Sequence, residues 1–145
     1  ARRQRQMCIR DSFNPDYDYP NCENNHINIP SKFYEKSIDI LGRDRMYIIC
    51  SNNIELTKKQ KVFQGDNFIF NEVVPDDIYK GHFDLCLMSM CQDFIISNST
   101  FAWWGAWLGT GVGKRVLIPT PWYGPGLSHI STDDLYPDEW EKIEW

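Results

Sequence analysis

Residues 92–108, QDFIISNSTFAWWGAWL, decide the fold class that this sequence predicts. The stretch opens with an apolar run at residues 94–96, continues through four small polar residues at 97–100, and closes with an aromatic segment that holds three tryptophans. A short apolar run, a polar turn and a longer apolar segment are typical of a buried strand, a tight turn and a helix. We therefore predict a strand–turn–helix unit at residues 92–108.

The polar turn at residues 97–100 is a candidate anion site. The first N–H groups of a helix have no partner inside the helix, and the helix dipole favours negative charge beside them. The hydroxyl groups of Ser99 and Thr100 can donate further hydrogen bonds to a phosphate. We predict that Asn98, Ser99 and Thr100 bind the phosphates of a nucleotide.

Two other interpretations of this turn stay open. Serine, threonine and asparagine are preferred at helix N-caps, so the turn could serve only to begin the helix. Asn98-Ser99-Thr100 also matches the pattern for N-glycosylation, although a glycan would not fit between a buried strand and a buried helix.

Outside this unit, apolar runs alternate with segments of helical periodicity. We predict strands at residues 46–50, 67–70, 93–97 and 115–118. We predict further helices at residues 31–41, 54–63, 83–91 and 138–143, the first of them capped by Ser31 and stopped by Gly42. Strands that alternate with helices indicate an α/β fold with a Rossmann-like, mostly parallel sheet flanked by helices.

In such sheets, ligands bind beyond the carboxyl ends of the strands. This rule gathers three polar or aromatic segments at one edge, namely residues 51–53, 97–100 and 119–123. Their convergence is a second argument for a nucleotide site. Ser51, Asn52 and Asn53 are therefore candidates to contact the nucleotide.

Composition and charge exclude several classes of protein. The 145 residues fit one domain, and 42% of them are hydrophobic. The net charge of −5 argues against binding to nucleic acid, which favours a basic surface. The sequence contains no run of 18 apolar residues, which is the length needed to span a membrane, and no signal peptide is recognisable.

Cysteines and histidines give no sign of a metal site. The spacing of the five cysteines fits neither a zinc site nor a disulfide scaffold, which indicates buried free thiols in a reducing compartment. The three histidines are scattered along the chain, and none pairs with a second ligand four residues away.

The first twelve residues, ARRQRQMCIRDS, carry four arginines and show no periodicity. They resemble foreign sequence at the end of a gene fragment, and a genuine basic arm is the alternative. We expect residues 1–12 to be a foreign or disordered segment, and residues 13–145 to form a partial Rossmann-like domain that binds a nucleotide.

The central stretch also resembles the C-terminal signature of glycosyltransferase family 11, the α-1,2-fucosyltransferases. Further segments agree in order and spacing: CSNN at 50–53, DLCLMSMC at 84–91, VLIPTPWY at 116–123 and YPDEWEKI at 136–143. The resemblance covers residues 31–145, and the double tryptophan after a small polar turn makes it specific.

The resemblance implies an enzyme that transfers L-fucose from GDP-fucose to a galactoside in α-1,2 linkage, with inversion and without a metal or another cofactor. Its partners would be this nucleotide-sugar donor and a galactose-terminated glycan acceptor, with no nucleic acid. The implied location is the cytoplasm, with peripheral membrane association of the parent enzyme left open. The implied architecture is the C-terminal half of a GT-B type glycosyltransferase.

The family also carries a His-x-Arg-Arg-x-Asp motif whose arginine neutralises the diphosphate leaving group. Cys8-Ile9-Arg10-Asp11 is a poor match to that motif. The acceptor-binding half of the family has no counterpart in this sequence either. We therefore assign no catalytic residue to this chain and expect it to be inactive alone.

The resemblance assigns roles to other single residues. Asp84 stands about where related fucosyltransferases read guanine with an aspartate, since one carboxylate can accept two N–H groups; the alternative is that Asp84 charges a helix N-terminus. Asn52 and Asn53 replace residues that are often acidic in the family. Trp122 and Tyr123 are expected at the site edge, in contact with the donor or the acceptor.

The tryptophans of the central stretch are expected to pack in the core rather than to bind a sugar, because their spacing covers a core face. Two other functions stay open for the whole chain. One is a GT-B enzyme with another donor or linkage, such as a protein or α-1,6 fucosyltransferase. The other is a non-catalytic α/β module that docks a partner through its aromatic tail.

Overall fold

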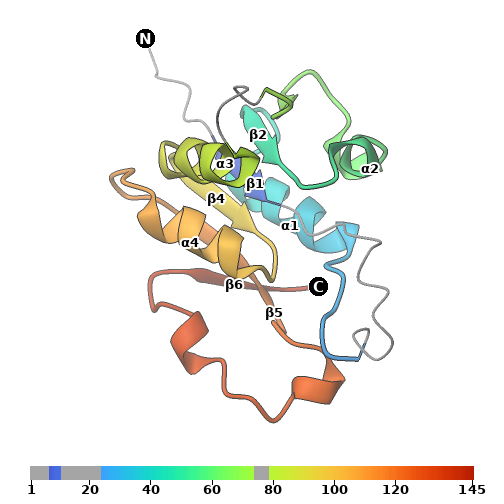
Figure 1. Cartoon of the computed structure of the whole chain (residues 1–145), viewed down its shortest axis with the longest axis vertical. Helices are drawn as coiled ribbons and strands as arrows, with labels where there is room; N and C mark the ends of the chain where they lie inside the picture. Colours follow the sequence, from blue (N-terminus) through green and yellow to red (C-terminus); the bar gives the residue numbers. More distant parts are fainter. Residues whose placement is uncertain (1–6, 11–23, 74–78) are drawn as a thin grey trace.

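The computed structural model describes residues 7–10, 24–73 and 79–145. Within these ranges, parallel strands form one six-stranded sheet in the order β3-β2-β1-β4-β5-β6 (Figure 1). The strands are β1 (Met7–Arg10), β2 (Tyr47–Cys50), β3 (Phe68–Phe70), β4 (Asp93–Ile96), β5 (Val116–Thr120) and β6 (Glu141–Glu144). This is the strand order of a Rossmann fold, so the prediction of a Rossmann-like α/β sheet is confirmed, and the sheet is wholly parallel.

Helices cover both faces of the sheet. They are α1 (Ser31–Leu41), α2 (Ile54–Lys58), α3 (Lys80–Ser89) and α4 (Thr100–Leu108), with short 3-10 turns at η1 (Lys61–Phe63), η2 (Pro125–Leu127) and η3 (Asp133–Leu135). Figure 1 shows α3 and α4 side by side on one face and α1 on the other. The segment after β5 passes around the end of α4 and returns to the sheet as β6.

The strands separate two hydrophobic cores. Alternate strand residues such as Cys8, Phe94 and Val116 point towards α3 and α4, whereas Ile9 and Ile95 point towards α1. Both sets are buried. A strand that is buried on both faces reads as a continuous apolar run, which is why β2 and β4 could be predicted from sequence.

The first strand comes from the segment that we expected to be foreign or disordered, residues 1–12. Met7–Arg10 forms β1 and pairs with β2 on one side and β4 on the other. Met7, Cys8 and Ile9 are fully buried. Met7, Cys8 and Ile9 form too short an apolar run, in a segment rich in arginine, to be recognised as a strand from sequence. The neighbouring strands β2 and β4 bury them. Residues 1–6 and 11–12 lie outside the described residues.

The ends of α1 follow the prediction with a shift of one residue. Ser31 is the first helical residue and Pro30 occupies the cap position, without a side-chain cap. Gly42 ends the helix at φ 114°, where its N–H donates to the Ile38 carbonyl at 2.8 Å. A positive φ of this kind favours glycine, so the predicted stop at Gly42 is confirmed.

The predicted helix at residues 138–143 is wrong, because Glu141–Glu144 forms the edge strand β6. It pairs in parallel with β5, buries Ile143 and leaves Lys142 and Glu144 exposed. The Glu141 carboxylate accepts two hydrogen bonds from Arg115, at 2.7 and 2.8 Å. Charged residues around one apolar position suit an edge strand but gave no strand signal by themselves. The predicted strand at 115–118 continues through Pro119 to Thr120.

Helix α4 is closed at its carboxyl end by a lysine. The Lys114 ammonium donates to the carbonyls of Ala106, Trp107 and Gly109 at 2.8–3.1 Å. Burial lowers the pKa of Lys114 below its ordinary value. In the part of the chain that the structure describes, no helix combines the length and apolar character needed to cross a bilayer.

We predict that Ile9→Ala lowers the free energy of unfolding by about 2–4 kcal/mol, because it opens a cavity beside the central strand. Ile69→Ala on the edge strand β3 is the matched control. Ile69 is 50% exposed whereas Ile9 is 0% exposed, so we expect the control to lose less than about 1 kcal/mol. Urea unfolding measures both, and equal losses would contradict the central position of β1.

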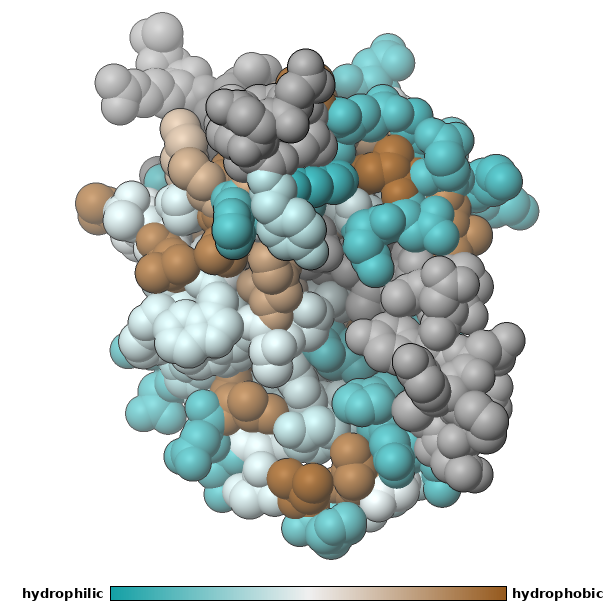
Figure 2. All heavy atoms as spheres, in the orientation of Figure 1, coloured by the Kyte–Doolittle hydropathy of each residue, from teal (hydrophilic) through white to brown (hydrophobic). Residues whose placement is uncertain are grey.

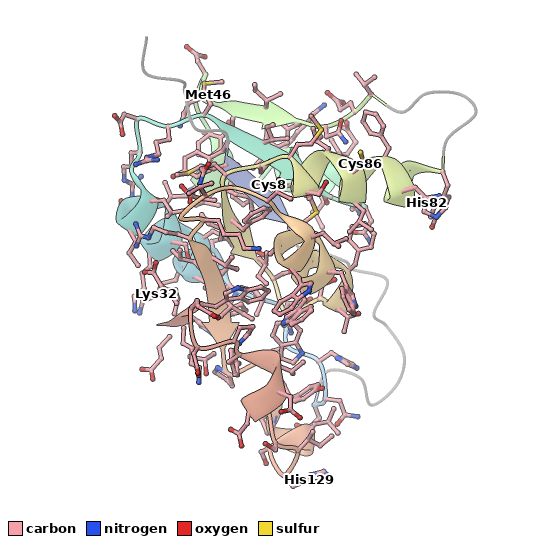
Figure 3. All side chains as sticks on the ribbon, turned by 90° about the vertical axis from the view of Figure 1, so that its left-hand side faces the viewer. Cys8, Lys32, Met46, His82, Cys86 and His129 are labelled. Atoms are coloured by element: carbon pink, nitrogen blue, oxygen red, sulfur yellow. The ribbon has the colours of Figure 1, made fainter. Side chains whose placement is uncertain are left out.

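Three thiols gather on the α3–α4 side of the sheet. The Cys8 and Cys50 sulfurs lie 3.8 Å apart, and Cys91 is buried in the same core. Hydrogen bonds with Cys50 and Cys91, together with burial, raise the pKa of Cys8 well above its ordinary value. Figure 3 shows Cys8 within the sheet and Cys86 on α3. The prediction of buried free thiols is confirmed for Cys8, Cys50 and Cys91, whereas Cys86 is free but exposed, so its predicted burial is wrong. Cys22 lies outside the described residues.

Among these four cysteines, we expect only Cys86 to react with iodoacetamide at pH 8 in the folded protein. The thiolate is the nucleophile, and a raised pKa together with burial keeps Cys8 a thiol at this pH. Peptide mass spectrometry after native and denaturing labelling measures each site. Native labelling of Cys8 or Cys50 at the rate of Cys86 would contradict the buried cluster.

Candidate functional site

The carboxyl ends of the strands define one edge of the sheet. Strand order reverses between β1 and β4, and in open α/β sheets this reversal opens a crevice for ligands. Arg10, the last residue of β1, pairs in register with Cys50 of β2 and Ile96 of β4. The turns after β2 and β4 therefore begin on either side of the Arg10 backbone.

The turn after β4 combines a helix cap with an accessible helix end. Ser99 is the N-cap of α4, and its hydroxyl accepts a hydrogen bond from the Ala102 N–H at 3.4 Å. Thr100 is the first helical residue and is exposed. Ser97 is fully buried, and its hydroxyl has no hydrogen-bond partner among the described residues. The capping interpretation thus holds for Ser99, while Thr100 remains available to a ligand.

Asn98 is held between two other segments of the chain. Its side-chain nitrogen donates to the Ile27 carbonyl at 2.9 Å and to the Trp122 carbonyl at 3.1 Å. A primary amide has two N–H groups, so these two bonds use the donor capacity of the side chain. The residue ties the turn to the segment before α1 and to the loop after β5.

The turn after β2 is held mainly by its own side chains. The buried Ser51 hydroxyl accepts from the Asn53 N–H at 3.0 Å and from the Thr57 hydroxyl at 2.9 Å. Asn53 caps α2, because its side-chain oxygen accepts from the Leu56 N–H at 3.1 Å. Asn52 is exposed. Of the three predicted residues, Asn52 is the one whose side chain faces solvent.

Asp84 lies one turn inside α3, which begins at Lys80, so the prediction that Asp84 opens this helix is wrong. It is only 2% exposed. Its carboxylate accepts from Asn71 at 2.6 Å and from the Lys80 ammonium at 2.8 and 2.9 Å. Asn71 follows β3, and its N–H donates to the Ile49 carbonyl of β2. The carboxylate therefore already binds a cation and an amide beside the carboxyl edge.

The aromatic residues divide differently from the prediction. The Trp122 ring is buried in the α3–α4 core, so its carbonyl rather than its ring meets Asn98, and Tyr123 packs against the same core. Trp103 donates from its indole nitrogen to the Leu135 carbonyl at 2.9 Å and stacks on Trp107 at 5.1 Å between ring centroids. Trp104 and Trp107 are 53% and 50% exposed.

The predicted packing in the core is thus confirmed for Trp103, whereas Trp104 and Trp107 are only half buried. Figure 2 shows mainly white and brown side chains over α4, and teal side chains lie among white and tan ones over α3. The exposed large apolar residues of this region are Met90, Trp104, Trp107, Leu108 and Val112.

The described residues contain no cluster of His, Cys, Asp or Glu that could hold a metal ion. Figure 3 places His82 on α3 and His129 in the C-terminal segment, far from each other. At the carboxyl edge the groups suited to a ligand are instead a helix N-terminus, the Thr100 hydroxyl and the Asn52 amide.

Sequence reasoning missed the position of Arg10 and the partners of Asp84. Arg10 lay in a segment that was expected to be foreign, and only strand pairing reveals that it ends at the crevice. The spacing of Lys80 and Asp84, four residues apart on one helix, was a signal for their ion pair that the sequence analysis did not use.

A six-stranded parallel sheet with a helix N-terminus beside its strand-order reversal defines the Rossmann-like class of α/β domain. Comparison with known proteins gives the family. The model of "Glycosyl transferase family 11" matches residues 19–144, and the chain belongs to this family.

Two relatives come from Escherichia coli. An O-antigen biosynthesis glycosyltransferase, WbnK, is 31% identical over 119 residues, which are 79% of this chain and 38% of the relative. An alpha-1,2-colitosyltransferase is 33% identical over 119 residues, which are 78% of this chain and 39% of the relative. The chain thus spans under two-fifths of the length of these relatives. No solved structure matches the chain significantly.

We predict that Ser99→Ala lowers the free energy of unfolding by about 0.5–1 kcal/mol, because α4 loses its side-chain cap. Ser99→Thr keeps a hydroxyl at the N-cap and is the matched control. Urea unfolding of the two variants measures the difference, and identical stabilities would show that the 3.4 Å bond contributes nothing.

Proposed function

We propose that this chain is the donor-binding part of a GDP-fucose-dependent α-1,2-fucosyltransferase that acts on a galactoside with inversion. The observation that carries the proposal is the position of the α4 N-terminus, which follows β4 directly beside the β1–β4 reversal of the sheet. Membership of glycosyltransferase family 11 supports a nucleotide-sugar donor and a glycan acceptor. The C-terminal half of a GT-B enzyme is the architecture that we propose for it.

The chemical task at this site is to stabilise the departing diphosphate. Charge grows on the nucleoside diphosphate as the bond to the sugar breaks, and donors that are held in place before the reaction stabilise this charge. We propose that the first N–H groups of α4 and the exposed Thr100 hydroxyl supply such donors.

Recognition of the nucleoside is proposed for the residues on the β2–β3 side of the crevice. Asn52 is exposed after β2, and its amide can both donate and accept hydrogen bonds. Asp84 lies on the same side through its contact with Asn71. Its carboxylate is proposed to accept the guanine N–H groups by exchanging the Asn71 or Lys80 bond. No catalytic base is assigned to this chain.

A second donor is worth testing because one relative carries colitose in its name. Transfer from a colitose-carrying nucleotide is therefore the second candidate, with the same nucleotide site and a different sugar. Product analysis with both donors separates these candidates when it is made with the longer enzyme of which we propose this chain to be the donor-binding part. An α-1,6 or protein-directed linkage in the product would contradict the proposed acceptor.

We expect GDP to bind this chain at least about 10-fold more tightly than UDP, a difference of about 1.4 kcal/mol, in isothermal titration calorimetry. Tighter binding of UDP would contradict the GDP donor. Binding of neither nucleotide would favour the non-catalytic module.

Matched variants sharpen this test. Thr100→Ala should weaken the binding of GDP. Thr110→Ala, at an exposed threonine just beyond α4, should leave it unchanged. Thr100→Ala should also leave the binding of guanosine unchanged, since guanosine has no phosphates to bind. An equal loss of GDP and guanosine binding would show that Thr100 acts through the fold instead.

A further inference from the structure

Three segments that are distant in sequence close around Asn98. They are residues 24–27 before α1, the turn after β4, and residues 122–126 after β5. The Gly124 N–H donates to the Asn25 carbonyl at 2.8 Å, and the Gly126 N–H donates to the Asn24 carbonyl at 2.7 Å. With the two bonds of Asn98, four hydrogen bonds join these segments, and we call this arrangement the loop clasp.

Two glycines are required for the close approach of the clasp. A Cβ atom on Gly124 would lie 2.5 Å from the Asn24 carbonyl oxygen, and a Cβ on Gly126 would collide with the Asn25 side chain. Both glycines have an ordinary backbone conformation, because neither shows a positive φ. The absence of a side chain at these positions therefore serves backbone contact rather than backbone freedom.

We infer that Asn98 is a positioning residue for the donor site and not a ligand of the phosphates. A phosphate requires donors, and both N–H groups of the Asn98 amide are already bonded to carbonyls. What the clasp does is to hold the segments before α1 and after β5 against the turn that begins α4. This inference rests on the proposed function of that turn and revises the direct donor contact expected of Asn98.

The physical consequence is preorganisation. Ligands bind more weakly when the loops around a site must first be ordered, because ordering costs free energy at the moment of binding. Asn98 adjoins Ser99 and Thr100, so loss of its two bonds releases the segments that fix the start of α4. The clasp therefore acts on nucleotide affinity through geometry, without touching the nucleotide.

A double-mutant cycle tests this inference with GDP as the probe. Asn98→Ala removes two bonds of the clasp, and Gly124→Ala forces its backbones apart. Because both changes open the same clasp, we expect each single variant to lower the affinity for GDP by about 10-fold. The double variant should lower this affinity by about 10-fold as well. Asn28→Ala, an exposed asparagine next to the clasp, is the control and should bind GDP normally.

A direct role of Asn98 would give a different result. If its side chain contacts the phosphates, the two effects are independent and the double variant loses about 100-fold. Unchanged GDP affinity in Asn98→Ala would also overturn the inference. Thermal unfolding of each variant checks that it remains folded, and Gly124→Ala alone keeps the test valid if Asn98→Ala does not fold.

Amide exchange separates failure of the clasp from failure of the proposed function. Asn98→Ala should speed exchange of the Gly124 and Gly126 amides, measured by NMR without nucleotide, whereas Asn28→Ala should not. If Asn98→Ala speeds exchange of these amides but the chain binds no GDP, the clasp is supported and the proposed function is contradicted. Unchanged exchange would overturn the clasp, whatever the nucleotide does.

Discussion

Pairing of β1 between β2 and β4 is the constraint on which the other parts of this structure depend. In a parallel sheet no strand can reach its neighbour through a short turn, so each pairing joins segments that are distant in sequence. Met7–Arg10 supplies hydrogen bonds to both halves of the sheet and buries side chains in both cores. It also places the strand-order reversal, and hence the crevice, next to the turn that begins α4.

Much of the architecture could be predicted where several consecutive residues are apolar and therefore buried. The apolar runs of β2 and β4 and the apolar length of α4 gave the parallel sheet and the strand–turn–helix unit. Strands β1 and β6 were missed because their burial comes from neighbours in space. The strand at Met7–Arg10 has only three apolar residues before its charged last residue, and Glu141–Glu144 buries chiefly Ile143. Short edge and central strands of this kind have no periodicity for a sequence to display.

Site residues were harder to assign than elements because polar side chains at a sheet edge also hold that edge together. Ser51, Asn53 and Ser99 were chosen for their chemistry, and each of them bonds to the backbone of its own turn or helix. Asp84 was chosen as a hydrogen-bond acceptor and already has two partners. Asn52 and Thr100 are exposed, so their side chains can contact a ligand, as the sequence analysis expected of them. Local caps hold Ser51, Asn53 and Ser99, whereas a tertiary contact with Asn71 holds Asp84. Spacing alone does not tell a capping side chain from a ligand-binding one.

The stacked indoles of Trp103 and Trp107, with Trp140 beside them, join α4 to the C-terminal segment. Aromatic side chains that are fixed by tertiary packing give a near-ultraviolet circular dichroism signal, which is lost when that packing is lost. The protein thus carries its own optical reporter, one that records whether the C-terminal segment is seated on α4 without any added dye.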